Sequence, residues 1–262
     1  MTAKRSILIS GNWKMYENHY ESIKLIQELA ALLRAQGVPN HREVSVHPPF
    51  TSIRTVQTAV ESDHLPLALG AQTCHFADRG PYTGEISAEM LAKLGVTLVI
   101  AGHSERRTLL GETDEIVRRK VDAILRNAMR PILCVGESVD ERSEGRAKEV
   151  VARQLRAALE DRPTEQVATC VIAYEPLWAI GTGETASPQD AMEMCSAIRA
   201  VIGEIAGPVA DECLIQYGGS VNPENAPELL KAKNVDGLLV GGASLDATKF
   251  MAIVHAGHEL VR

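Results

Sequence analysis

Short apolar runs alternate along the chain with longer segments in which apolar residues recur at every third or fourth position. Compact runs rich in Val, Ile and Leu are typical of buried strands, whereas the longer spacing is that of one face of a helix. Residues 18–36, for example, place Ile26, Leu29 and Leu33 on one helical face and stop at Gly37, a residue type that often ends helices. The pattern therefore predicts a regular succession of strands and helices.

Eight strand–helix units are predicted in this way. We expect strands at residues 6–10, 44–46, 67–71, 97–101, 131–135, 167–174, 214–217 and 237–240, and helices at 18–36, 52–62, 87–94, 114–128, 143–160, 188–206, 224–232 and from 247 onwards. Such alternation requires a parallel sheet, and eight units close naturally into an α/β fold of the (β/α)8 or TIM barrel type, with helices surrounding eight parallel strands. No linker or shift in composition divides residues 1–262, so we expect a single domain.

An open doubly wound sheet is the alternative architecture. It is less favoured because no Gly-Xaa-Gly-Xaa-Xaa-Gly sequence follows the first strand.

The composition narrows the class of protein. The hydrophobic fraction of 45% and the charged fraction of 23% are those of a globular protein with a sizeable core. A net charge of −7 argues against nucleic acid or an anionic membrane as partners. The five cysteines are odd in number and lack Cys-Xaa-Xaa-Cys spacing, so neither a disulfide framework nor a zinc site is indicated. With no signal-like or membrane-spanning segment at the N-terminus, we expect a cytoplasmic protein.

Chemically active side chains follow several predicted strands at their carboxyl ends, the edge at which such barrels carry active sites. Glu175 follows the sixth strand, and a carboxylate held there is placed for acid–base chemistry. Asn12 and Lys14 follow the first strand, and His103 and Ser104 follow the fourth. We therefore expect a base, an imidazole and an ammonium group to converge on one face of the barrel.

Glycine-rich segments complete this edge. The apolar segment after Glu175 closes on residues 181–183, Gly-Thr-Gly, which is how a hinged lid over a pocket would be built. Gly218, Gly219 and Ser220 follow the seventh strand, and Gly241 and Gly242 follow the eighth, where barrels of this kind often bind phosphate. Backbone N–H groups there would hold a dianion without net positive charge, so an acidic protein could still bind an anionic substrate.

Each of these residues also has an ordinary structural explanation. Glu175 could form a simple ion pair, Lys14 could be a surface lysine, and His103 could be a hydrogen-bonded structural histidine. Cys134 follows the pattern of a core residue, because nothing nearby in the sequence would lower the pKa of its thiol.

Five sequence blocks together resemble the triosephosphate isomerase family. They are Gly-Asn-Trp-Lys-Met (11–15), Ala-Gly-His-Ser-Glu-Arg-Arg (101–107), Ala-Tyr-Glu-Pro-Leu-Trp-Ala-Ile-Gly-Thr-Gly (173–183), Tyr-Gly-Gly-Ser-Val (217–221) and Leu-Val-Gly-Gly-Ala-Ser-Leu (239–245). They occur in the family's order and cover essentially the whole chain. The resemblance implies interconversion of dihydroxyacetone phosphate and glyceraldehyde 3-phosphate through an enediolate, as part of glycolysis and gluconeogenesis, without a cofactor or metal.

Roles for individual residues follow from this resemblance. It implies that Glu175 is the base, that neutral His103 donates a hydrogen bond, and that Lys14 and Asn12 hold substrate oxygens. This family is itself a standard example of pKa tuning and loop closure, so these roles are carried over and are not independent deductions. Glu105 is a plausible partner for Lys14. The residues implied to grip the phosphate under the lid are Gly181, Ser220, Gly241 and Gly242.

The resemblance also implies a homodimer in which loop 72–85 plugs into the partner, with Thr83 reaching the other active site. Tyr16, Pro81 and Glu184 depart from the family's usual residues, and the first two lie at the implied interface. These departures leave open a related isomerase acting on a four-carbon ketose phosphate. The third alternative is a barrel that binds a phosphometabolite without catalysis. The joint presence of Asn12, Lys14, His103 and Glu175 argues against it.

Overall fold

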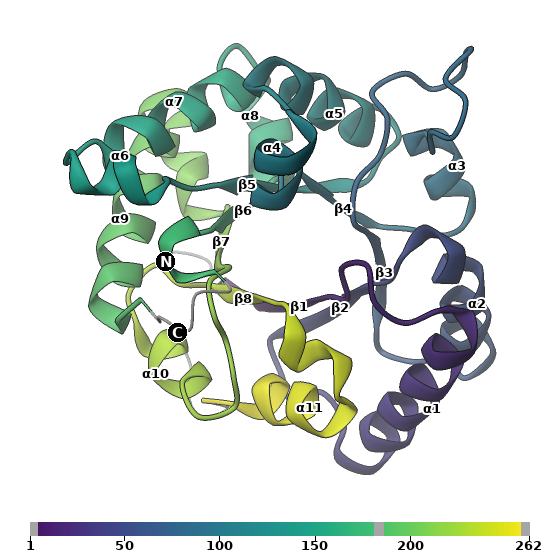
Figure 1. Ribbon diagram of the computed structural model, residues 1–262. Helices are drawn as coiled ribbons and strands as arrows, with labels where there is room; N and C mark the ends of the chain where they lie inside the picture. Colours follow the sequence, from purple (N-terminus) through teal and green to yellow (C-terminus); the bar gives the residue numbers. More distant parts are fainter. Residues whose placement is uncertain (1–4, 181–185, 258–262) are drawn as a thin grey trace.

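The computed structural model describes residues 5–180 and 186–257. Eight parallel strands form a closed barrel in the order of the sequence, so the fold is the expected (β/α)8 or TIM barrel (Figure 1). They are β1 (Ile7–Asn12), β2 (Arg42–His47), β3 (Ala68–Ala71), β4 (Leu98–Ala101), β5 (Arg130–Val135), β6 (Val171–Tyr174), β7 (Leu214–Tyr217) and β8 (Gly237–Val240). Pairing of Leu8 in β1 with Gly237 in β8 closes the sheet, which excludes the open doubly wound alternative.

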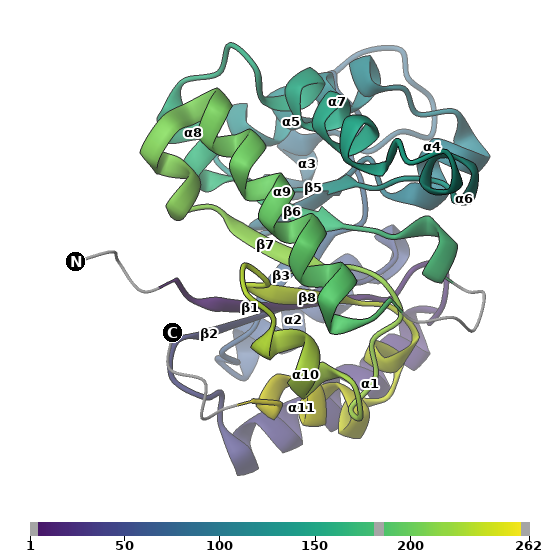
Figure 2. The same cartoon turned by 90° about the vertical axis from the view of Figure 1, so that its left-hand side faces the viewer.

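Helices surround the strands on the outside, as the perpendicular view shows (Figure 2). The α-helices are α1 (His19–Gln36), α2 (Phe50–Ser62), α3 (Ala88–Lys93), α4 (Ser104–Leu110), α5 (Asp114–Arg126), α6 (Val139–Ser143), α7 (Ala147–Leu159), α8 (Thr164–Thr169), α9 (Pro188–Ala206), α10 (Ala226–Lys231) and α11 (Ala247–His255). Three 3-10 helices join them: η1 (Leu177–Ala179), η2 (Gly207–Asp211) and η3 (Gly242–Leu245). In the described ranges, no helix is long and apolar enough to cross a bilayer.

Local sequence signals account for the helix boundaries. Asn18 caps α1, because its side chain accepts hydrogen bonds from the first-turn N–H groups while Glu21 bonds back to the Asn18 N–H. Ser187 and Asp190 form the same reciprocal arrangement at the start of α9, where Pro188 occupies the first helical position. These caps fix the residues at which α1 and α9 begin.

The core has two parts. Inside the barrel, buried apolar side chains from alternate positions of the strands pack on one another; they are Leu8, Leu98, Ile100, Ile132, Cys134, Val171, Ala173, Leu214 and Leu239. A larger apolar layer lies between the strands and the helices. Burying a large aliphatic side chain contributes about 1.5–3 kcal/mol, so both layers stabilise the scaffold that holds the strand ends.

Two predicted elements were wrong in extent. The strand expected at 167–174 begins only at Val171, because Pro163 starts α8 over Thr164–Thr169. The helix expected at 143–160 begins only at Ala147, as α7, and is preceded by α6, which was not predicted. Gly145, whose φ of 73° lies in the left-handed region, separates the two. Apolar periodicity alone does not reveal such breaks, since short helices and strands share apolar runs.

Candidate active site

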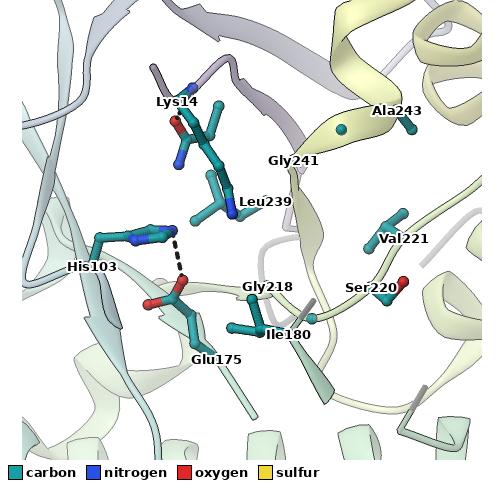
Figure 3. Close-up of a pocket in the computed structure, with 13 residues that line it drawn as sticks. Lys14, His103, Glu175, Ile180, Gly218, Ser220, Val221, Leu239, Gly241 and Ala243 are labelled. Atoms are coloured by element: carbon teal, nitrogen blue, oxygen red, sulfur yellow. Dashed lines mark hydrogen bonds and ion pairs between the residues drawn. The ribbon is translucent and has the colours of Figure 1, made fainter. Parts of the chain in front are cut away.

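The carboxyl ends of five strands surround a cavity of about 290 Å³ at one mouth of the barrel. In the described part of the chain its lining comprises Asn12, Lys14, His103, Glu175, Ile180, Gly218, Gly219, Ser220, Val221, Leu239, Gly241, Gly242 and Ala243. Figure 3 shows the ionisable groups on one side and the glycine-rich loops on the other. The fold thus gathers residues that are far apart in the sequence into one cavity.

Glu175 and His103 contact each other directly at the floor of this cavity. Glu175 follows β6 and its side chain is only 2% exposed. The distance between His103 Nε2 and Glu175 Oε1 is 2.9 Å (Figure 3). The second oxygen, Oε2, accepts a hydrogen bond of 2.9 Å from the backbone N–H of Ser104. Both oxygens of the carboxylate are therefore engaged, which fixes its orientation.

The other nitrogen of His103 faces the start of α4. Its Nδ1 accepts a hydrogen bond of 3.2 Å from the Glu105 backbone N–H, so Nδ1 carries no proton in this arrangement. Burial lowers the pKa of His103, but the carboxylates of Glu175 and Glu105 outweigh it and raise the pKa above the ordinary value. The pairing with Glu175 was not anticipated from the sequence. It favours the protonated imidazole, whereas the N–H groups at the start of α4 favour the neutral one. The geometry corresponds to the neutral tautomer with its proton on Nε2.

Opposing effects also act on the acid. Burial raises the pKa of Glu175, but the contact with His103 and the N–H of Ser104 outweigh it and lower the pKa below the ordinary value. In the free protein Glu175 is therefore held as a carboxylate. Beneath it, burial raises the pKa of the Cys134 thiol, and the negative charge of Glu175 raises it further. Cys134 is accordingly an inert core thiol, as the sequence indicated.

Lys14 projects into the cavity from the loop after β1. Its Nζ lies 2.6 Å from Glu105 Oε1, the pairing expected from the sequence. Its backbone is in the left-handed region, with φ of 52°, and its N–H donates to Asn12 Oδ1 at 3.0 Å. The side chain of Gln72 donates to the Lys14 carbonyl at 2.7 Å and secures this turn. Sequence reasoning had not assigned Gln72 a role, although its position directly after β3 was a usable signal.

The glycines after β7 and β8 leave space for ligand and catalytic groups. A Cβ at Gly218 would lie 3.1 Å from the Cγ of Glu175, and one at Gly241 would lie 3.5 Å from the Cε of Lys14. A side chain at Gly218 would therefore crowd the acid, whereas a Cβ at Gly241 would make an ordinary contact with the Lys14 side chain. Ser220, Gly241 and Gly242 all line the cavity. Ser220 and Gly241 lie on the side opposite His103 (Figure 3).

Two predicted residues, Gly181 and Thr83, are not part of this arrangement, and two others contact it without lining the cavity. Gly181 lies outside the described residues. Thr83 lies in the exposed loop between β3 and α3 and is absent from the described lining of the cavity. Ser104 and Glu105 act at the floor through a backbone N–H and a carboxylate. Conversely, the apolar lining residues Ile180 and Leu239 were not predicted, because apolar residues next to strand ends resemble ordinary core positions.

Comparison with known proteins agrees with this geometry. The family model described as triosephosphate isomerase matches residues 7–257. A curated triosephosphate isomerase from Rhodococcus jostii is 50% identical over 259 residues, covering 98% of this chain and 99% of that protein. The one from Cutibacterium acnes is 48% identical over 252 residues, covering 95% and 97%. The one from Chloroflexus aurantiacus is 49% identical over 249 residues, covering 95% and 98%. The chain therefore belongs to the triosephosphate isomerase family.

Proposed function

We propose that this protein interconverts dihydroxyacetone phosphate and D-glyceraldehyde 3-phosphate. The observation that carries the proposal is the buried contact between the Glu175 carboxylate and His103 Nε2, in a cavity that also contains the Lys14 ammonium group. The reaction moves a proton between adjacent carbons and needs one base and a means of stabilising an oxyanion. Family membership supports the same reaction.

Glu175 is the base in this proposal. Its carboxylate removes a proton from the hydroxymethyl carbon of the ketose, which leaves an enediolate, and returns a proton to the neighbouring carbon. The hydroxyl proton passes meanwhile from the oxygen of the first carbon to the oxygen of the second, so that the first carbon becomes the aldehyde of the aldose. A carboxylate whose pKa is lowered in the free protein is ionised at neutral pH and ready to accept the proton. In this proposal both Glu175 and His103 face the substrate, so its binding replaces their direct contact with bonds to the ligand.

His103 and Lys14 stabilise the developing charge. The neutral imidazole donates its Nε2 hydrogen to an enediolate oxygen, consistent with the hydrogen bond that Nδ1 accepts from the Glu105 N–H. Lys14 supplies a positive charge, and Asn12, which is 5% exposed, offers an amide next to it. In a largely enclosed site such interactions are stronger than in water.

Ser220, Gly241 and Gly242 bind the phosphate through backbone N–H groups in this proposal, across the cavity from the reacting carbons. Gly181 is assigned to the same phosphate grip, and the segment that carries it is assigned the role of a lid that keeps water from the enediolate. Residues 181–185 lie outside the described chain, so the proposal for them rests on sequence alone.

Steady-state assays in both directions, with dihydroxyacetone phosphate and with glyceraldehyde 3-phosphate, test the proposal. A parallel assay with a four-carbon ketose phosphate distinguishes the related isomerase. The reaction should also be run in deuterated water, because transfer through Glu175 exchanges the moving proton with solvent. Absence of interconversion of the triose phosphates, with or without activity on the four-carbon substrate, would refute the proposed substrate.

We further propose that the protein is a homodimer through loop 72–85. In that loop the rings of His75 and Phe76 lie 4.1 Å apart and those of His75 and Tyr82 lie 4.2 Å apart. Arg119 lies over the Phe76 ring at 3.4 Å, while Tyr82 remains 43% exposed and Tyr16, in the loop after β1, 59% exposed. Covering these rings with an identical subunit would remove apolar surface from water.

The remaining proposals concern organisation and location. Closure of the barrel by β1 and β8 supports a single domain over residues 1–262, because the first and last strands of the described chain pair with each other. An acidic chain with buried, unpaired cysteines suits a reducing cytoplasm and a small anionic substrate, and we assign it neither nucleic acid nor membrane as partner.

A further inference from the structure

The guanidinium of Arg142 contacts two segments on either side of residues 181–185. Arg142 lies in α6, after β5. Its Nη2 atom is 2.7 Å from Asp190 Oδ1 in the first turn of α9. Its Cζ lies 4.3 Å from the centroid of the Trp178 ring in η1, the segment that follows Glu175. One side chain therefore joins the segment after β5 to two parts of the unit that follows β6.

A third contact leads towards the active site. The Nη1 atom of Arg142 lies 3.2 Å from Glu137 Oε1. The same oxygen accepts hydrogen bonds of 3.0 Å from the Tyr174 hydroxyl and 3.0 Å from Trp178 Nε1. The Leu177 N–H donates to the Glu137 carbonyl at 3.3 Å. Glu137 thus holds the residues on both sides of Glu175, and Arg142 is bonded to the same oxygen.

Charge explains why Glu137 needs this partner. Glu137 is 0% exposed, and its second oxygen has no hydrogen-bond partner among the described residues. A buried carboxylate without a nearby cation is strongly destabilising. Arg142 supplies that cation and, being planar with several donors, can bond Glu137 and Asp190 at once while it covers the face of Trp178. A lysine could not make all three contacts.

The backbone transmits this restraint to Glu175. Tyr174 immediately precedes Glu175, and its carbonyl accepts a hydrogen bond of 2.7 Å from the Gly218 N–H. The Glu175 N–H donates to the Val135 carbonyl at 2.8 Å. Rotation or withdrawal of the Tyr174 and Trp178 side chains would therefore displace the strand end that aims the carboxylate. Displacing a catalytic group by about 1 Å can lower a rate roughly 100-fold.

We propose that Arg142 is a positioning residue for the reaction: it clamps the segment that carries Glu175 to α9 through Glu137, Trp178 and Asp190. The inference rests on the proposed isomerase function, because it concerns how precisely the base is aimed. Arg142 does not line the cavity in the described part of the chain and is not itself a catalytic residue.

The test compares Arg142→Met and Arg142→Lys with Arg146→Met. Arg146 is a matched control, since it lies four residues further along and pairs only locally, at the exposed Glu144. Arg142→Met should lower kcat roughly tenfold or more and change KM by less than about threefold, because misaiming the base weakens the transition state more than ground-state binding. Arg142→Lys should fall between Arg142→Met and wild type. A kcat of Arg142→Met within about twofold of the control overturns the proposal.

Tryptophan fluorescence provides a readout that general loss of stability would not change in the folded protein. The chain has two tryptophans, Trp13 and Trp178, and Trp13 is fully buried. In Arg142→Met the emission should shift to longer wavelength and become more accessible to acrylamide, because the Trp178 ring loses its cover; Trp178→Phe identifies the component that shifts. A fall in kcat with unchanged Trp178 emission would place the effect elsewhere and overturn the proposal.

The double variant Arg142→Met/Glu137→Gln keeps the proposal testable if the single variant does not fold. A neutral glutamine removes the unpaired buried charge and still accepts hydrogen bonds, so the double variant should fold. Its kcat should remain low, because the links to Asp190 and Trp178 are lost; full recovery would show that Arg142 only neutralises Glu137. If the wild-type protein has no triose phosphate activity, the proposed function fails, and the fluorescence comparison still tests the clamp on its own.

Discussion

His103 Nε2 lies 2.9 Å from Glu175 Oε1, so the imidazole and the carboxylate of the candidate site contact each other directly. The carboxylate raises the pKa of His103, and the imidazole lowers the pKa of Glu175, so each group favours the charged form of the other. Burial acts against the charged form of both groups.

Shortening the side chain of the base tests its role directly. Glu175→Asp draws the carboxylate back by one methylene and should lower kcat roughly 100-fold or more while the barrel persists, because placement within about 1 Å decides the rate. Steady-state kinetics and circular dichroism measure the two effects. Glu149→Asp, an exposed position in α7, is the matched control. Turnover of Glu175→Asp at the wild-type rate would remove Glu175 from the role of base.

Removal of the ammonium group in the cavity should abolish turnover. Lys14→Met eliminates the charge that is held 2.6 Å from Glu105, and substrate binding should weaken as well. Lys14→Arg should not restore full activity, since a planar fork cannot take the place of a compact charge. Lys148→Met, on an exposed face of α7, controls for loss of a surface lysine. Normal binding and turnover by Lys14→Met would show that the glycine-rich loops alone recognise the charge of the substrate.

Shortening loop 72–85 should give folded monomers that are nearly inactive. The loop carries the ring cluster of His75, Phe76 and Tyr82, and the proposed partner surface would press on the turn that holds Asn12 and Lys14. Losing that contact should loosen the turn without unfolding the barrel. Light scattering and activity measured on one sample test this. A fully active monomer would contradict the proposed dimer and leave Thr83 without a catalytic role.

Stability should fall as pH is lowered from about 6.5 towards 4, in part because of His47. Complete burial lowers the pKa of His47 from 6.5 to about 4, so the unfolded chain binds the proton more readily than the folded one. Its contribution is intact above pH 6.5 and is lost as pH falls through this window, reaching about 3 kcal/mol by pH 4. Urea unfolding of wild type and His47→Asn at pH 7 and pH 4 measures the difference. Equal pH dependence in both proteins would refute the assignment.

Much of the fold could be predicted because each signal was local. Apolar runs and caps located strands and helices well; the helix at Pro188–Ala206 and the strand at Leu214–Tyr217 were predicted to the residue. The errors arose where one backbone feature overrode periodicity, at Pro163 and at Gly145. Apolar periodicity does not reveal a single left-handed residue such as Gly145, which separates two consecutive helices.

The candidate site was predicted as a set of residues but not as a set of contacts. Residues that follow buried strands share one edge of any parallel barrel, so Lys14, His103 and Glu175 could be grouped before their positions were known. Their mutual bonding depends on how far each side chain extends across the mouth. Two of these contacts are hydrogen bonds between segments that are remote in the sequence. Gln72 bonds to the Lys14 carbonyl, and the Tyr174 hydroxyl bonds to Glu137.

The amino-acid sequence is sufficient to predict the order of the elements, the edge of the barrel that carries the candidate side chains and the types of group present there, because periodicity and strand ends are properties of neighbouring residues. The tertiary structure is needed to see that Glu175 contacts His103, that the Nδ1 of this imidazole accepts a hydrogen bond, and that Arg142 reaches Asp190. Those facts depend on closure of the barrel. Closure sets the distances between strands that are far apart in the sequence. Electrostatic and hydrogen-bond energies depend steeply on those distances.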